Sequence, residues 1–153
     1  MAGAVLTLEG LEKYLQSLGK SVLAVDWVPA LRRAAVLLAA EAKLAFHYGR
    51  APDGSAWKPL KNPSRKRGGA TAKPLRDTGL LMASLAGGGP QHAEDVSPLA
   101  LVWGTRVRYA GFHQYGTKHI PARPFLGFTP ALESRIDLLF RDHAEQVLKG
   151  VVP

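Results

Sequence analysis

Five histidines provide the side chains in this sequence that best suit acid–base chemistry near neutral pH, and two of them lie close together. His113 and His119 flank Gly116, and Tyr115 and Lys118 lie beside them. Such a group could serve acid–base cleavage of RNA. However, the histidine spacing matches no metal-ligand pattern, and the sequence shows no paired base or nucleophile. We therefore expect no catalytic residue, metal or cofactor, and we keep a small basic ribonuclease as an alternative.

Asp77-Thr78-Gly79 matches the triplet that carries the catalytic carboxylate of aspartic proteases. Such enzymes need a second triplet facing the first, and this sequence contains only one. We therefore interpret the triplet as the N-terminal cap of a short helix that runs through Leu85. The glycine run 87–89 lacks the context of a phosphate-binding loop and is predicted to be a hinge or a hairpin link.

The basic residues are concentrated in one segment of a chain whose formal net charge is +8. No acid lies between Asp53 and Asp77, where seven basic residues occur: Lys58, Lys61, Arg65, Lys66, Arg67, Lys73 and Arg76. We predict that residues 57–74 form a long mobile basic loop whose start is pinned by Trp57. The loop is either a solvated surface or an arm that orders on an acidic protein or on phosphates. No aromatic residue interleaves the charges, so any DNA contact would be independent of sequence.

The composition predicts one domain over residues 1–153 and places limits on its chemistry. There is no cysteine, which excludes disulfides and thiolate metal sites. The most apolar window, 28–46, carries Arg32, Arg33, Glu41 and Lys43, so no membrane contact is expected. The basic balance keeps a small nucleic-acid-binding protein open as a further alternative.

Two amphipathic helices are expected to frame the fold. Apolar residues at helical spacing predict a long helix from 28 to about Tyr48, with Asp26 as its N-cap. Thr129 and the proline that follows it predict the start of a C-terminal helix that ends at Gly150. A shorter helix is predicted over 11–18.

Strand patterns are shorter. Residues 99–104 alternate in a strand pattern, and the partner strand is expected at 84–88 or 91–96. Residues 5–8 are a further strand candidate, and 109–115 are either a short helix or an irregular turn. Gly104 and Gly116 are interpreted as turn glycines. The fold class is therefore α+β: a small antiparallel sheet flanked by a long helix in the N-terminal half and a C-terminal helix.

A series of short motifs, in order along about residues 31–140, resembles the Mu-like phage virion morphogenesis (tail completion) family. The motifs are Pro52-Asp53-Gly54 with Trp57, Asp77-Thr78-Gly79-Leu80, Gly104-Thr105, Tyr109-Ala110, His113-Gln114-Tyr115-Gly116 and Ala122-Arg123-Pro124-Phe125-Leu126-Gly127.

The resemblance implies a structural, non-enzymatic protein of a tailed phage or prophage, either a tail terminator or a neck protein. It implies a ring of about six identical subunits that docks on tail tube and neck or connector proteins. Such a protein would be found in the virion, and in the cytoplasm of the bacterial host during assembly.

The residues expected at interfaces come from the motif-rich centre of the chain and from the basic loop. We expect Arg123, held between two prolines, to project a fixed charge. The basic loop is expected to touch a neighbouring subunit or DNA. The full set of expected contact residues is Arg65, Lys66, Arg67, Tyr109, His113, Tyr115, Arg123 and Phe125. For Tyr109 and Phe125, the alternative is a place in the core.

Overall fold

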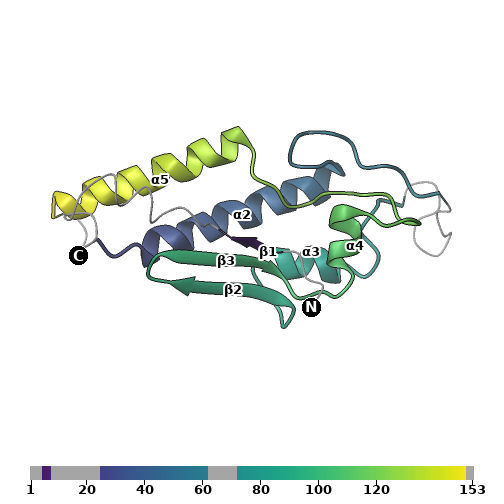
Figure 1. The fold of residues 1–153 in the computed structure, drawn as a ribbon, viewed down its shortest axis with the longest axis horizontal. Helices are drawn as coiled ribbons and strands as arrows, with labels where there is room; N and C mark the ends of the chain where they lie inside the picture. The colour runs from purple at the N-terminus through teal and green to yellow at the C-terminus, as the bar shows by residue number, and fades with distance from the viewer. Residues whose placement is uncertain (1–4, 8–24, 62–71, 151–153) are drawn as a thin grey trace.

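The computed structural model describes residues 5–7, 25–61 and 72–150. Helix α2 (Val28–Tyr48) lies between the sheet on one side and helix α5 (Pro130–Leu148) on the other (Figure 1). The buried residues of the helices and of the central strand form one hydrophobic cluster around α2. The α+β class predicted from the sequence is confirmed.

The sheet has three antiparallel strands in the order β1-β3-β2. Strand β1 is Val5–Thr7, β2 is His92–Ser97 and β3 is Ala100–Thr105. The second of the two proposed partner strands is therefore the correct one, and it forms a hairpin with β3. Gly104 was wrongly interpreted as a turn residue, because it pairs with β1 on one side and with β2 on the other.

Helix α2 extends over the predicted residues and packs an alanine-rich face inward. Small side chains on this face allow close approach of neighbouring elements. Its buried residues are Ala30, Leu31, Ala34, Ala35, Leu38, Ala39, Ala42, Ala45 and Phe46. The N-cap position is Trp27, one residue after the predicted Asp26, and the Trp27 side chain makes no capping hydrogen bond. Asp26 still serves the start of the helix, because its carboxylate accepts a hydrogen bond from the amide of Val28, the first helical residue, at 3.0 Å.

Helix α5 begins as predicted. The Thr129 hydroxyl accepts a hydrogen bond from the Leu132 amide at 3.2 Å. His143, on the apolar face of the helix, is only 1% exposed, and its Nε2 lies 2.6 Å from the carbonyl oxygen of Asp26. This buried histidine therefore ties α5 to the residues just before α2.

The triplet Asp77-Thr78-Gly79 caps helix α3 (Leu80–Leu85) as predicted, but through Gly79 and not through the carboxylate. Gly79 is the N-cap and has a left-handed backbone, with φ of 76°, which turns the chain into the helix. Asp77 therefore lies two residues too early to be the cap. The Thr78 hydroxyl accepts a hydrogen bond from the Leu80 amide at 3.3 Å.

Pro52-Asp53-Gly54 forms a tight turn. Asp53 accepts hydrogen bonds from the amide and the hydroxyl of Ser55, at 2.9 and 2.7 Å, and these bonds lower the pKa of its carboxyl group. Gly54 takes a positive φ of 88°. A Cβ atom on Gly127 would lie 3.2 Å from the Pro52 ring, so this motif packs closely against another one far along the chain.

Two predictions fall partly outside the described residues. Residues 57–61 and 72–74 contain neither helix nor strand. Residues 62–71, which include Arg65, Lys66 and Arg67, lie outside the described part, as does the helix expected over 11–18. The mobility expected of the basic loop stays a prediction. In the described ranges, no helix has the length and apolar character needed to cross a membrane.

Candidate interface

The motif-rich centre of the chain folds into a short helix and an extended segment that is bonded to it. Helix α4 (Ala110–Tyr115) carries Gln114, whose Oε1 accepts hydrogen bonds from the amides of Phe125 and Leu126 at 3.0 and 3.1 Å. Its Nε2 donates to the Leu126 carbonyl at 2.7 Å. In addition, the Arg123 amide donates to the His113 carbonyl at 2.7 Å. Gln114 therefore acts like a strand partner for the extended segment and satisfies three of its backbone groups.

A second set of contacts joins this segment to the start of the basic loop. The Trp57 indole donates to the Pro124 carbonyl at 2.7 Å, which confirms that Trp57 pins the start of the loop. Arg123 donates from Nε to the Lys58 carbonyl at 2.7 Å and from Nη2 to the Pro59 carbonyl at 3.0 Å. Burial lowers the pKa of its guanidinium below the ordinary value, although an arginine so bonded keeps its charge.

Between α4 and the extended segment, the chain makes a tight loop that only glycine can start. Gly116 has φ of 77° and ψ of 173°, and a Cβ atom there would lie 2.8 Å from the Ala122 nitrogen. The Thr117 hydroxyl then accepts hydrogen bonds from the amides of His119 and Ile120 at 3.2 and 3.0 Å. The prediction of a turn glycine is correct at this position.

Two clefts of about 420 Å³ open on this part of the molecule. The first lies between residues 75–81 and α4, and Tyr109 and His113 line it. Burial, assisted by the charge of Arg123, lowers the pKa of the His113 imidazole below its ordinary value. A largely neutral, partly apolar histidine suits a surface that receives apolar side chains.

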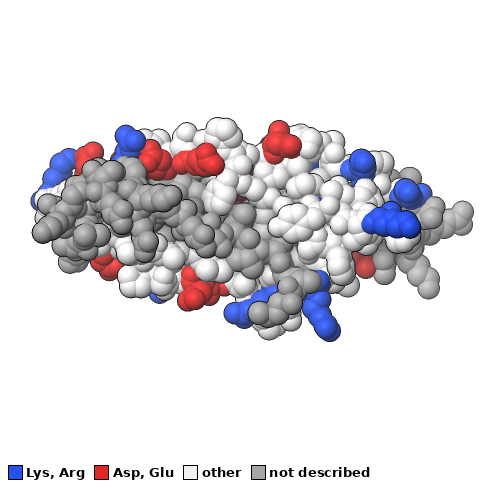
Figure 2. Space-filling view, viewed as in Figure 1, with Lys and Arg blue, Asp and Glu red and all other residues white. Residues whose placement is uncertain are grey.

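The second cleft, which we call the basic cleft, lies between residues 58–61 and residues 117–121. Lys58, Lys61, Lys118 and His119 line it, together with Pro59, Thr117, Ile120 and Pro121. In Figure 2, Lys and Arg side chains lie at the right-hand end, where Figure 1 shows the loop that follows α2 and the loop between α4 and α5. Other Lys and Arg side chains lie at the left-hand end and along the lower edge, and Asp and Glu lie mostly over the left half of this view. The fold therefore brings together cations that are far apart in the sequence.

Large aromatic side chains are exposed along α4. Tyr109, at its N-cap, is 39% exposed, Phe112 is 50% exposed and Tyr115 is 75% exposed. We call these three residues the aromatic face of α4. Solvent-exposed aromatic side chains on a well-held helix are typical of protein–protein contacts.

The predicted contact residues separate into two groups by burial. Tyr109, His113 and Tyr115 come together on α4, where His113 is half-buried and the two tyrosines are exposed. Phe125 is 1% exposed and packs on Phe46 in the core, and Arg123 is 5% exposed. The prediction that Arg123 projects its charge is therefore wrong, because two backbone carbonyls turn the guanidinium inward.

Sequence reasoning gave no role to Gln114 or Phe112 and did not bring Lys118 together with Lys58. Gln114 lies within one of the short motifs and Phe112 lies beside it, but no local pattern marks an amide that bonds a distant backbone. The pairing of the two walls of the basic cleft has no signal in the sequence, since more than fifty residues separate them.

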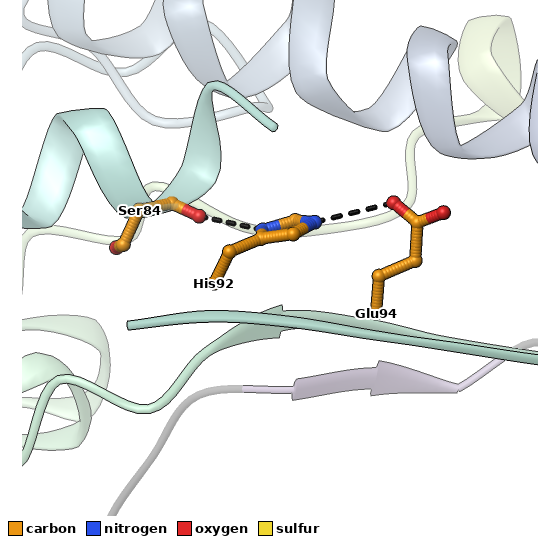
Figure 3. A network of polar contacts seen from close by, with 3 residues as sticks. All are labelled: Ser84, His92 and Glu94. Carbon is orange, nitrogen blue, oxygen red and sulfur yellow. Dashed lines mark hydrogen bonds and ion pairs between the residues drawn. The ribbon is translucent and has the colours of Figure 1, made fainter. Parts of the chain in front are cut away.

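Ser84, His92 and Glu94 have the residue types of a hydrolase triad, but their geometry differs from one (Figure 3). His92 Nδ1 lies 2.7 Å from the Ser84 carbonyl oxygen, and its Nε2 lies 3.2 Å from the Glu94 carboxylate. The Ser84 hydroxyl is buried and instead donates to the Leu81 carbonyl, with the Thr105 hydroxyl 2.7 Å away. The trio therefore joins α3 to the sheet and presents no nucleophile to its base.

A metal site and a two-histidine ribonuclease site are the other chemistries to consider. Within the described ranges, no group of three or more His, Asp or Glu side chains could hold a metal ion. His113 and His119 line different clefts, so they do not form the pair that a two-histidine ribonuclease would need.

Comparison with known proteins gives one consistent result. The family model described as the phage virion morphogenesis family matches residues 6–145. The Mu-like prophage FluMu G protein 1 of Haemophilus influenzae is 36% identical over 115 residues, which cover 73% of this chain and 75% of that protein. No solved structure matches the chain.

Proposed function

This chain belongs to the phage virion morphogenesis family, and on that premise we propose that it is the structural protein that completes or caps the tail at the head–tail junction. Identical subunits form a ring of about six, which docks on the tail tube and on neck or connector proteins. The protein resides in the virion and assembles in the cytoplasm of the bacterial host. Its work is the formation of interfaces, and no catalytic group takes part.

The observation that carries this proposal is the aromatic face of α4. Exposed Tyr and Phe side chains bury a large area on association and lose little conformational entropy, so they often anchor interfaces. The helix that bears them is held by Gln114 and by the amide of Arg123. The face is therefore ordered before a partner arrives, and this lowers the entropic cost of docking.

A ring requires two different surfaces on each subunit, because a head-to-tail contact joins unlike patches. We place the aromatic face of α4 on one side of this contact. The neighbouring cleft, which Tyr109 and His113 line, extends the same surface and offers a recess for an apolar side chain.

The proposal is tested by measuring solution mass by light scattering across a concentration series, with negative-stain images of the same samples. The unmodified chain should form closed rings at high concentration. Phe112→Ser with Tyr115→Ser should shift the protein to monomers. The matched control is Leu138→Ser with Leu148→Ser, which removes two side chains that are each 59% exposed on α5. A control that dissociates the rings as fully as the α4 variant would contradict this choice of surface.

The tail assignment itself needs particles. In a phage or prophage that carries this gene, loss of the protein should leave filled heads and separate tails, and the unmodified gene should restore joined particles. The α4 variant should fail to restore them, and the α5 control should succeed. Normal particles without the protein would overturn the proposed function.

A further inference from the structure

The basic cleft contains a concentration of positive charge that the proposed subunit contacts do not use. Its two walls come from stretches that contain no Asp or Glu, residues 54–76 and 96–132. Lys58, Lys61 and Lys118 are exposed, and within the described part of the chain none of them forms an ion pair. Like charges held together without counterions raise the local potential, and an anion would relieve this repulsion.

Hydrogen bonds hold both walls, so this concentration of charge is built into the fold. Arg123 holds the Lys58 wall through the carbonyls of Lys58 and Pro59, and the Trp57 indole bonds the segment that follows the opposite wall. The Lys118 wall is closed by the hydrogen bond from the Thr117 amide to the Ile120 carbonyl at 2.8 Å. The buried guanidinium of Arg123 adds a further positive charge behind the lysines.

We propose that the basic cleft binds the phosphate backbone of a DNA duplex without regard to sequence. Lysine ammonium groups on facing walls bind phosphates as point charges and impose no demand on geometry. A duplex presents one phosphate charge for about every 1.7 Å of its axis, so the three lysines face several phosphates at once. The described lining contains no Phe, Tyr or Trp on which unpaired bases could stack, which favours a duplex over a single strand.

Carboxylates of an acidic protein would be the competing occupants. Specific binding of carboxylates commonly uses the arginine fork, which donates two parallel hydrogen bonds. Arg123, the arginine that holds one wall, already uses its Nε and Nη2 on backbone carbonyls. The cations that line the described cleft are lysines, which suit a dense row of phosphates better than scattered carboxylates. This inference does not depend on ring formation.

The test measures fluorescence anisotropy of a labelled random-sequence DNA duplex of about 20 base pairs with the full-length protein, over a range of salt concentrations. The logarithm of the binding constant should fall linearly with the logarithm of salt. The triple variant Lys58→Gln, Lys61→Gln and Lys118→Gln should lower the slope by about 2.7, at about 0.9 for each phosphate that a lysine no longer neutralises. At about 0.1 M salt, the affinity should fall at least tenfold.

Two further variants show whether the loss of DNA binding comes from the cleft lysines themselves, from the lower net charge or from a folding defect. Arg32→Gln, Arg33→Gln and Lys43→Gln remove the same total charge from the exposed side of α2 and should leave the slope unchanged. Replacing the three cleft lysines with arginine should preserve the slope. If the α2 variant weakens binding as much as the cleft variant, the binding is diffuse and the proposal is overturned.

A competition experiment decides between the two classes of partner. Unlabelled duplex should displace the labelled duplex at a lower charge concentration than either a single strand or polyglutamate. Stronger competition by polyglutamate would overturn the proposal in favour of an acidic protein. Stronger competition by the single strand would overturn the assignment to a duplex.

Discussion

Replacing Gln114 with leucine should destabilise the fold by about 3 kcal/mol, because three hydrogen bonds to buried or half-buried backbone are lost together. The amide oxygen accepts from Phe125 and Leu126, and the amide nitrogen donates to Leu126. A typical bond of this kind contributes about 1 kcal/mol net, and each backbone group left without a partner costs about 1 to 3 kcal/mol. Leucine has nearly the same volume, so the loss of hydrogen bonds is separated from the loss of packing.

The assay is urea unfolding followed by circular dichroism, at one protein concentration for every variant. With an m-value of about 2 kcal/mol/M, the expected loss moves the midpoint down by about 1.5 M. Gln114→Glu is the informative intermediate, because its carboxylate still accepts from both amides but cannot donate to the Leu126 carbonyl. It should lie between the wild type and the leucine variant.

The matched control is Gln146→Leu on α5. This glutamine is half-buried, and its side chain makes no hydrogen bond in the part of the chain that the structure describes. Its replacement should change the free energy of unfolding by less than about 0.5 kcal/mol. If Gln114→Leu is as mild as this control, Gln114 does not hold the extended segment, and its hydrogen bonds do not preorganise the aromatic face of α4.

Three further perturbations test other parts of the fold by the same unfolding assay. Gly116→Ala should lower the free energy of unfolding by about 2 to 4 kcal/mol, because its Cβ would overlap the facing backbone. Gly54→Ala, also at positive φ but in open space, should lower it by about 1 kcal/mol. Equal losses in the two variants would refute the overlap at Gly116. Thr129→Ala should lower the free energy of unfolding by about 1 kcal/mol, because the helix loses its cap. Thr129→Ser should keep most of that stability. If the serine variant is as unstable as the alanine variant, the hydroxyl does not cap the helix. Burial, assisted by the guanidinium of Arg123, lowers the pKa of His113 in the folded chain. As the pH falls, the imidazole therefore binds its proton in the unfolded chain before it does so in the folded chain. The stability that this group contributes is complete above its ordinary pKa of 6.5 and declines as the pH falls below that value. His113→Gln should flatten that decline and the exposed His47→Gln should not, and an unchanged pH profile in the first variant would contradict the assignment.

The sequence by itself determined the main elements, because their signals are local. Helical spacing of apolar residues and the Thr129 cap were enough to place α2 and α5, and the alternation before Thr105 placed β3 to within one residue. Local signals also located the helix starts, but not the exact N-cap residue. The acidic residues Asp26 and Asp77 lie one and two positions before the N-caps, which are Trp27 and Gly79. The order of the short motifs was sufficient to indicate the family.

Only the tertiary structure decided what the motif residues do. A charged residue that lies close to two prolines is expected to be exposed. Arg123 is buried, because its hydrogen-bond acceptors are carbonyls 65 and 64 residues away in the chain. Gln114 gains its role from the backbone of a segment that folds back on α4. The basic cleft exists only where two acid-free stretches meet. Periodicity and capping act over one or two turns of chain, whereas burial and charge clustering depend on which distant segments the core brings together.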